Sequence, residues 1–232
     1  MKNYIFILLL LISISGYSQR IYPATQTELI FSMASMNKTT IPTSQVVRFS
    51  AVINHESQLH VNFNKSFGYY TGFGIKNIGM INRFSNQDIN FKQRAYAVSL
   101  PLAIKFGSVQ KEQFFALGGE LNFLFHYKEK FLYDDTKIKR SEWFSSKVNA
   151  FQPAVFLQIK YFKSQAITFK YFLNDFLNYQ PGGLLLPDGT LVNDYGRSSH
   201  LFYISWASHL EIKDSDKKKP DPPKIRTARL DY

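Results

Sequence analysis

Residues 94–107 read RAYAVSLPLAIKFG, and a large apolar side chain occupies every second position of this stretch. The large file holds Tyr96, Val98, Leu100, Leu102, Ile104 and Phe106, and the positions between them hold Ala95, Ala97, Ser99, Pro101, Ala103 and Lys105. Successive side chains of a β-strand point to opposite faces of the sheet. The period of two therefore predicts a strand with one apolar face and one face of small or polar side chains.

The same alternation recurs along the chain and predicts eight strands. They span residues 27–36, 45–64, 67–83, 91–107, 113–130, 149–163, 165–177 and 200–212. The long connections are 37–44, 84–90, 131–148 and 178–199, and the short ones, which alternate with them, are 65–66, 108–112 and 164. Alternate connections of an up-and-down meander lie at the same end of the sheet. We therefore expect long loops at one end and short turns at the other, as in outer-membrane barrels.

Alternating strands also occur in soluble sandwiches and lipocalin-like barrels, whose apolar file packs inward. Strand length favours a membrane barrel, because most segments run about twelve residues or more and soluble strands average about five or six. The polar file consists mostly of Gly, Ala, Ser, Asn and Gln, which suits the narrow interior of eight strands. A mean hydropathy of −0.20 is too low for a helical membrane protein but fits a half-polar barrel.

Aromatic side chains gather near both ends of the predicted strands, as in the interfacial girdles of membrane barrels. One group comprises Tyr127, Phe131, Tyr133, Trp143 and Phe144, beside the third long loop. The other group comprises Phe63, Phe67, Phe106, Tyr161 and Phe162, near the short turns. Together these features predict an all-β fold, an eight-stranded antiparallel up-and-down transmembrane β-barrel. An even number of strands places both termini on the short-turn, periplasmic side.

Single charges on the small-residue file predict a polar network inside the barrel. The expected members are Arg48, Lys76, Lys105, Glu120, Asn122, Lys160, Lys170 and Glu211. Buried charges must pair, so Glu120 and Glu211 are the expected acceptors for the cations. His126 falls on the same predicted inward file as Glu120. Pro101 lacks the hydrogen-bond donor of a strand residue and is expected to cause a bulge or a local gap in the ladder.

The N-terminus has the layout of a secretory signal peptide over residues 1–18. Lys2 precedes an apolar run from Tyr4 to about Ile14, and small residues follow it before the expected cleavage site. The alternative is a retained signal anchor, for which the run is short. Residues 19–212 then form the barrel. The chain has no cysteine, which excludes disulfides, a lipid-modified N-terminal cysteine and thiolate metal sites.

A formal net charge of +11 favours anionic partners. For an exported protein we expect outer-membrane lipid, lipopolysaccharide, or an acidic membrane or periplasmic protein, and no nucleic acid. In the segment 131–148, Lys137, Lys139 and Arg140 are expected to contact lipopolysaccharide phosphates. The alternative is a solvated loop of mixed charge, and solubility alone is the alternative for the overall charge.

Two further segments suggest contacts with a partner. The PDG turn at residues 187–189 predicts a hairpin within 178–199, with Leu184, Leu185 and Leu186 exposed for a protein contact. The alternative is a hairpin folded over the barrel mouth. Residues 213–232 form a basic, proline-containing periplasmic tail, expected either to bind an acidic partner or to have no role. Its cations are Lys217, Lys218, Lys219, Lys224, Arg226 and Arg229.

Three stretches resemble one group of known proteins. YTGFGIKNIG (70–79), RAYAVSLPLAIKFG (94–107) and FFALGGELNFLFHYKEKF (114–131) are similar to the small outer-membrane β-barrel proteins of Bacteroidetes-type bacteria. Those proteins belong to the porin-like and OmpA-like barrel group. The resemblance covers most of residues 45–212. It implies an integral outer-membrane location in a Gram-negative bacterium and supplies no catalytic residues.

The residues offer little for catalysis. The five histidines are His55, His60, His126, His200 and His209, and none forms an assembled triad with Ser and Asp in the predicted strands. The sequence contains no Gly-rich phosphate loop and no HExxH motif. We expect a non-enzymatic protein without cofactor or metal, a structural or accessory subunit of an outer-membrane complex. The alternatives are a narrow porin-like channel and a lipid-modifying enzyme.

Overall fold

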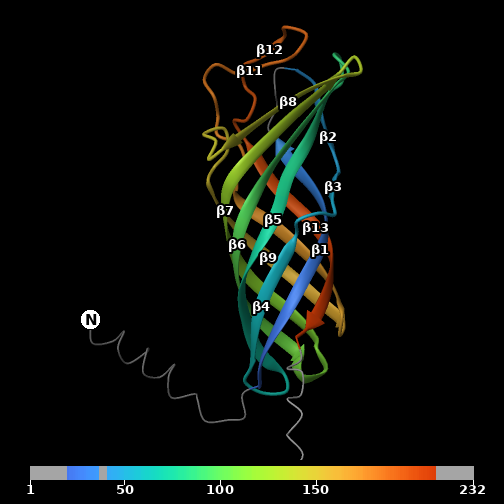
Figure 1. The fold of residues 1–232 in the computed structure, drawn as a ribbon, viewed down its shortest axis with the longest axis vertical. Coiled ribbons are helices and arrows are strands. Elements are labelled where there is room, and N and C mark those ends of the chain that lie inside the picture. Colours follow the sequence, from blue (N-terminus) through green and yellow to red (C-terminus); the bar gives the residue numbers. More distant parts are fainter. Residues whose placement is uncertain (1–19, 37–40, 213–232) are drawn as a thin grey trace, which may run out of the picture.

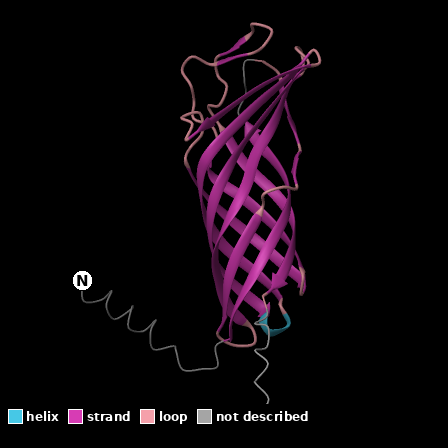
Figure 2. Ribbon diagram, in the orientation of Figure 1, coloured by secondary structure: helices cyan, strands magenta, loops and turns pink. Residues whose placement is uncertain are grey.

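The computed structural model describes residues 20–36 and 41–212, and most of this part is β-strand (Figures 1 and 2). The strands are β1 (Arg20–Met36), β2 (Thr43–Val46), β3 (Arg48–Ser50), β4 (His55–Asn62), β5 (Phe67–Phe84), β6 (Ile89–Ser108), β7 (Gln113–Tyr133), β8 (Thr136–Trp143), β9 (Phe151–Phe162), β10 (Gln165–Asp175), β11 (Leu184–Leu185), β12 (Leu191–Val192) and β13 (Ser199–Glu211). A short 3-10 helix, η1 (Val109–Lys111), connects β6 and β7. In the described residues, no helix is long and apolar enough to cross a membrane. The predicted signal peptide (1–18) and basic tail (213–232) lie outside the described residues.

The sheet closes on itself as an eight-stranded antiparallel barrel (Figure 1). Around the wall the order is β13, β10, β9, β7, β6, β5, β4 and β1, and β1 pairs again with β13 from Ala24↔Glu211 to Met36↔Ser199. β2 and β3 continue the wall beyond β4. β8 lies beside the far half of β7, whose other half pairs with β9. The predicted up-and-down barrel is confirmed.

The two ends of the barrel differ. The turn end holds the short connections 63–66, 109–112 and 163–164, the start of β1 and the last residues of β13. The loop end holds the hairpins β5–β6 and β7–β8 and the segment 176–198 (Figure 1). The predicted long loop 131–148 is largely strand, and the predicted long loop 84–90 is reduced to a turn at residues 85–88, because pairing of β5 to β8 continues past the closed wall.

The outward face of β6 is apolar over its whole length in the wall. Its large side chains, from Val98 to Phe106, are 40–61% exposed, and the side chains of the small file between them are buried. Phe106 lies ten positions after Tyr96. At about 3.4 Å per residue and a tilt of about 40°, this stretch spans about 26 Å, close to the apolar band of about 25 Å in membrane barrels.

Pro101 interrupts the ladder between β5 and β6, as expected. The pairing runs up to Thr71↔Leu102 and resumes in the same register at Gly74↔Ser99, with no paired residues between. The Thr71 hydroxyl donates to the Pro101 carbonyl oxygen at 2.9 Å. The predicted local gap is confirmed, and no register shift accompanies it.

An extra residue in β7 reverses the side-chain pattern in its second half. The β6–β7 register shifts between Ala97↔Leu124 and Tyr96↔His126, which leaves Phe125 as a bulge. Beyond a bulge each side chain points to the opposite face from the one its position predicts.

Four predictions made without this bulge are wrong. Tyr127 and Phe131 are buried inside the barrel, Tyr133 packs against the same interior core, and none of the three belongs to the outer aromatic girdle. His126 stacks on Trp143 with ring centroids 4.2 Å apart, so it does not share the inward file of Glu120.

The predicted strand 45–64 is broken into β2, β3 and β4. From Thr27↔His55 to Ile30↔Ser50, β1 advances three residues while its partner advances five. The surplus residues form a bulge at 51–54, where Ile53 has a φ of 62°. A side chain in this left-handed conformation cannot continue a strand, which explains the break.

The interior at the loop end is a hydrophobic core. Its larger members are Ile30, Ile78, Met80, Phe84, Phe91, Phe131, Phe172, Phe176, Leu186, Val192 and Tyr195. β11 pairs with β12, so the predicted hairpin in 178–199 is present. However, Leu186 is buried and Leu184 is partly buried, so only Leu185 is exposed. The prediction of three exposed leucines is wrong because the hairpin packs over the barrel mouth.

Candidate functional site

Lys76, on β5, is the centre of a buried ion cluster midway along the barrel. Its Nζ lies 2.7 Å from Glu28 Oε1, 2.9 Å from Glu56 Oε2 and 3.5 Å from Glu120 Oε2. Lys170 donates to Glu120 Oε2 at 2.5 Å. All five side chains are only 1–3% exposed. At this depth the charge of each side chain is compensated by its ion-pair partners, because water does not reach it.

This cluster brings together three of the predicted interior residues, Lys76, Glu120 and Lys170. It also contains Glu28 and Glu56, which were missed as acceptors. Both stand on inward files of their strands, at alternate positions from other buried polar residues. The signal in the sequence is that both residues occupy inward positions of the alternating pattern. A search for carboxylates at every inward position could have found them.

A second polar group lies nearer the turn end. Lys105 Nζ donates to Asn62 Oδ1 at 2.7 Å and lies 3.0 Å from His60 Nδ1. Lys160 Nζ pairs with Glu112 Oε2 at 2.9 Å.

Three predicted members of the network lie outside these two groups. Glu211 forms its ion pair at 2.6 Å with Arg20, a half-exposed residue at the turn end, and acts on the buried Lys160 only as a neighbouring charge. The reason is its place as the last residue of β13, at the rim. Asn122 is buried and donates to the backbone of Gln152. Arg48 donates to Asn77 and contacts none of the other predicted members in the described part of the chain.

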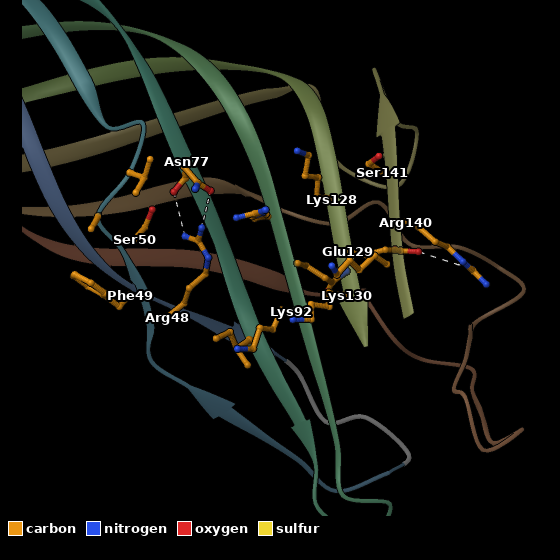
Figure 3. A pocket seen from close by; sticks show the side chains of 16 residues that line it. Arg48, Phe49, Ser50, Asn77, Lys92, Lys128, Glu129, Lys130, Arg140 and Ser141 are labelled. Carbon is orange, nitrogen blue, oxygen red and sulfur yellow. Dashed lines mark hydrogen bonds and ion pairs between the residues drawn. The ribbon is translucent and has the colours of Figure 1, made fainter. Parts of the chain in front are cut away.

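The outer surface at the loop end carries a basic pocket, formed by Arg48, Lys92, Arg94, Lys128, Lys130 and Lys139 (Figure 3). Its volume is about 680 Å³. Most of these residues come from β6, β7 and β8, which the register brings side by side. Arg48 comes from β3 and reaches the pocket across β5, where it donates to Asn77. Of the predicted lipopolysaccharide contacts, Lys139 and Arg140 line this pocket, whereas Lys137 is exposed farther along β8. Sequence reasoning missed Lys92 and Arg94, although both continue the outward file of Tyr96.

The base of the β7–β8 hairpin is held by an ion network outside the apolar band. Ser145 Oγ donates to Glu142 at 2.6 Å, and Lys147 Nζ lies 2.9 Å from Glu142 and 3.1 Å from Glu129. The hydrogen bonds from Ser145 and Lys147 lower the pKa of Glu142. Partial burial disfavours the charge on Lys147, but its bonds to Glu142 and Glu129 outweigh burial and raise its pKa.

This network should make the hairpin sensitive to acid. The pKa of Glu142 is lower in the folded protein than the value of about 4.3 for a free Glu. Glu142 therefore stabilises the hairpin fully above about pH 4.3, and this stabilisation is lost as the pH falls through the folded-state pKa. Emission from Trp143, read in a Trp206→Phe background, should therefore change as the pH falls below about 4.3. The Glu142→Gln variant should lack this step, and an unchanged step would contradict the assignment.

Comparison with known proteins finds similarity in structure only. No family model matches the chain, and no curated protein matches it. Ail, the attachment invasion locus protein of Yersinia pestis, solved with the heparin analogue sucrose octasulfate, is 14% identical with a TM-score of 0.37, covering 82% of this chain and 99% of that chain. Neisserial surface protein A (NspA) is 10% identical with a TM-score of 0.41, covering 84% and 99%. The outer membrane protein OprG from Pseudomonas aeruginosa is 11% identical with a TM-score of 0.33, covering 82% and 96%. Similarity this low supports no conclusion about function, and the fold rests on the strand pairing described above.

Proposed function

We propose that the protein is an integral outer-membrane β-barrel that acts as a non-enzymatic structural or accessory subunit of an outer-membrane complex. The observation that carries the proposal is the exposed apolar wall of a closed barrel. Isolated apolar side chains on a surface need no explanation, but a continuous band about 26 Å high would be costly in water. A lipid environment removes that cost.

The filled interior argues against conduction and for a structural role. The charged cluster around Lys76 occupies the middle of the barrel, the hydrophobic core occupies the loop end, and the hairpin containing Leu186 covers the mouth. Eight strands enclose a space that side chains can fill completely. This filling disfavours the narrow-channel alternative.

We further propose that the protein has no enzymatic activity and needs no cofactor. Among the described residues, His60 lies between the rings of Tyr22 and Tyr70, and His209 is buried without a hydrogen-bond partner. Neither has the carboxylate that orients a catalytic base. His200 does lie near one, with its Nε2 3.7 Å from Asp175 Oδ1, but the neighbouring Ser199 is buried and its hydroxyl oxygen accepts from the Leu177 backbone. A lipid-modifying activity would need a nucleophile and an oriented base at the lipid interface.

The proposed orientation places the loop end outside the cell and both termini in the periplasm. Short periplasmic turns and longer external segments are the rule for bacterial barrels. The proposed partners are outer-membrane lipid and lipopolysaccharide at Lys137, Lys139 and Arg140, together with a membrane or periplasmic protein. Leu185 and the basic tail are the parts of the chain offered for that protein contact.

Two measurements test the membrane assignment and the absence of a pore. The purified protein should require detergent and should migrate faster on gels before heating than after, because a closed barrel resists unfolding. A protein that stays soluble without detergent would overturn the membrane assignment. In planar bilayers the inserted barrel should give no conductance steps above baseline, and regular steps would favour the channel.

The accessory role is tested by recovery of the protein from native membranes. In mild detergent, a tagged chain should be recovered in a stoichiometric complex larger than the monomer. A variant carrying Leu185→Ser should retain the barrel and lose part of that complex if the hairpin is the contact. Recovery of a lone monomer, under conditions that preserve other membrane complexes, would contradict an accessory role.

A further inference from the structure

The basic pocket contains like charges placed directly opposite one another. Lys92 on β6 faces Lys130 on β7, which in turn faces Lys139 on β8. Two residues farther along β6, toward the closed part of the barrel, Arg94 faces Lys128. Like charges directly opposite each other destabilise a sheet. Two adjacent rows of this kind on one face indicate a surface that an anion stabilises.

Acidic side chains do not balance these cations. In the described part of the chain, Glu129 is the only acid lining the pocket, and it pairs with Lys147 at 3.1 Å and with Arg140 at 3.9 Å. Seven cations and one carboxylate give the lining a net charge of +6. Desolvation and the neighbouring cations, Lys137 and Lys92 foremost, lower the pKa of Lys130.

Arg48 extends the pocket into a break in the wall. β5 pairs with β4 up to Ile75 and with β2 from Ile81 onward, so the intervening residues pair with no described strand on that side. Side chains replace the ladder there: Arg48 donates to the Asn77 carbonyl oxygen at 3.1 Å and to Asn77 Oδ1 at 2.6 Å (Figure 3). Asn54 Oδ1 accepts from the Asn77 backbone at 2.9 Å.

The charge of Arg48 has no carboxylate partner among the described residues. The residue is 7% exposed, and both of its recorded hydrogen bonds go to the neutral Asn77. A guanidinium has five N–H donors in a planar fork that matches phosphate and carboxylate oxygens. A buried cation of this kind is costly unless an anion pairs with it. The ligand of the pocket should therefore bring an anion close to this position.

The position of the pocket selects the class of ligand. An outer aromatic row, Tyr96 facing His126 and His126 facing Trp143, runs across β6, β7 and β8. The two cation rows lie two and four residues farther toward the loop end, or about 7 and 13 Å along the strands. Aromatic side chains mark the membrane interface, so these cations lie at the level of lipid headgroups.

We infer that the basic pocket binds the phosphate groups of a phosphorylated glycolipid of the lipid A class in the outer leaflet. Lys92, Lys130 and Lys139 contact one phosphate region, and Arg48 and Arg94 contact the part nearest the wall. The acyl chains then lie along the apolar surface that begins with the exposed side chains of Phe49 and Val52. This inference rests on the proposed outer-membrane location and gives the lipid contact a defined site.

The test measures binding of bisphosphorylated hexa-acyl lipid A to the full-length barrel in detergent, by native mass spectrometry. The triple variant Lys92→Gln/Lys130→Gln/Lys139→Gln should bind about tenfold more weakly, as expected from losing three exposed ion pairs. The matched control Lys65→Gln/Lys111→Gln/Lys163→Gln removes three exposed lysines at the turn end and should bind as the wild type does. Dephosphorylated lipid A should bind weakly to all three proteins, and inorganic phosphate should not compete at equal concentration.

Equal binding of lipid A by the triple variant and the wild type would overturn the inference, as would equal binding of the dephosphorylated lipid. Competition by inorganic phosphate would assign the site to a free anion and would also overturn it. Without lipid, the triple variant should resist heat at least as well as the wild type, because its like charges are gone. The heat shift on gels reports separately on the barrel, so loss of lipid binding with an intact shift leaves the proposed membrane location standing.

Discussion

The Lys76→Met substitution is expected to lower the free energy of unfolding by about 3–5 kcal/mol, because it leaves Glu28, Glu56 and Glu120 without their shared cation in the barrel interior. Lys170 remains paired with Glu120 and neutralises one of the three carboxylates. Urea unfolding in lipid vesicles, followed by tryptophan emission and by migration on gels, measures the change.

Two companion variants separate charge from packing. Lys65→Met removes a lysine exposed at the turn end and should change the unfolding free energy by less than about 0.5 kcal/mol. Adding Glu28→Gln and Glu56→Gln to Lys76→Met should recover at least half of the loss, because fewer carboxylates then remain unpaired. A Lys76→Met protein as stable as the wild type would contradict the dependence of these carboxylates on Lys76.

The second large effect is expected on the outer wall. Leu102, 61% exposed, lies near the middle of the apolar band between Tyr96 and Phe106. The Leu102→Arg substitution should cost about 2–4 kcal/mol in vesicles, because a cation at the midplane of a bilayer is poorly solvated. In a soluble barrel the same side chain would extend into water, and the substitution would have little effect.

The matched control is Leu210→Arg, at an equally exposed leucine near the end of β13 at the turn end. Depth in the bilayer governs the penalty, so this change should cost no more than about 1 kcal/mol. Equal and small effects at Leu102 and Leu210 would contradict the membrane assignment. Equal and large effects would instead indicate that both sites are packed against protein.

The fold could be predicted because the side-chain alternation extends over long strands. RAYAVSLPLAIKFG shows both files clearly, and the structure buries the small one and exposes the large one. β8 could not be predicted in this way, because almost all of its side chains are exposed. Its sequence is rich in charged residues and shows no file of apolar side chains at every second position. Its pairing depends on β7 extending beyond the closed wall.

The candidate site was less accessible to prediction, because parity gives the face of a residue but not its neighbours. Lys76 and Glu120 were placed inside correctly. The alternation also places Glu28 and Glu56 inside, but only the pairing of β1, β4 and β5 shows that they are the acceptors for Lys76. The basic pocket needs the register of β6, β7 and β8, which the bulge at Phe125 shifts. No local pattern in the sequence reveals a single surplus residue of this kind.

The surplus residue Phe125 divides β7 into two parts with opposite side-chain alternation. Before it, odd-numbered side chains face outward; after it, even-numbered ones do. Deleting one residue here would turn Lys128 and Lys130 toward the hydrophobic core and turn Tyr127 outward. Loops at either end can gain or lose residues, but this strand cannot gain or lose even one. Variants of the chain should therefore differ in loop length and keep the spacing between Phe123 and Tyr127.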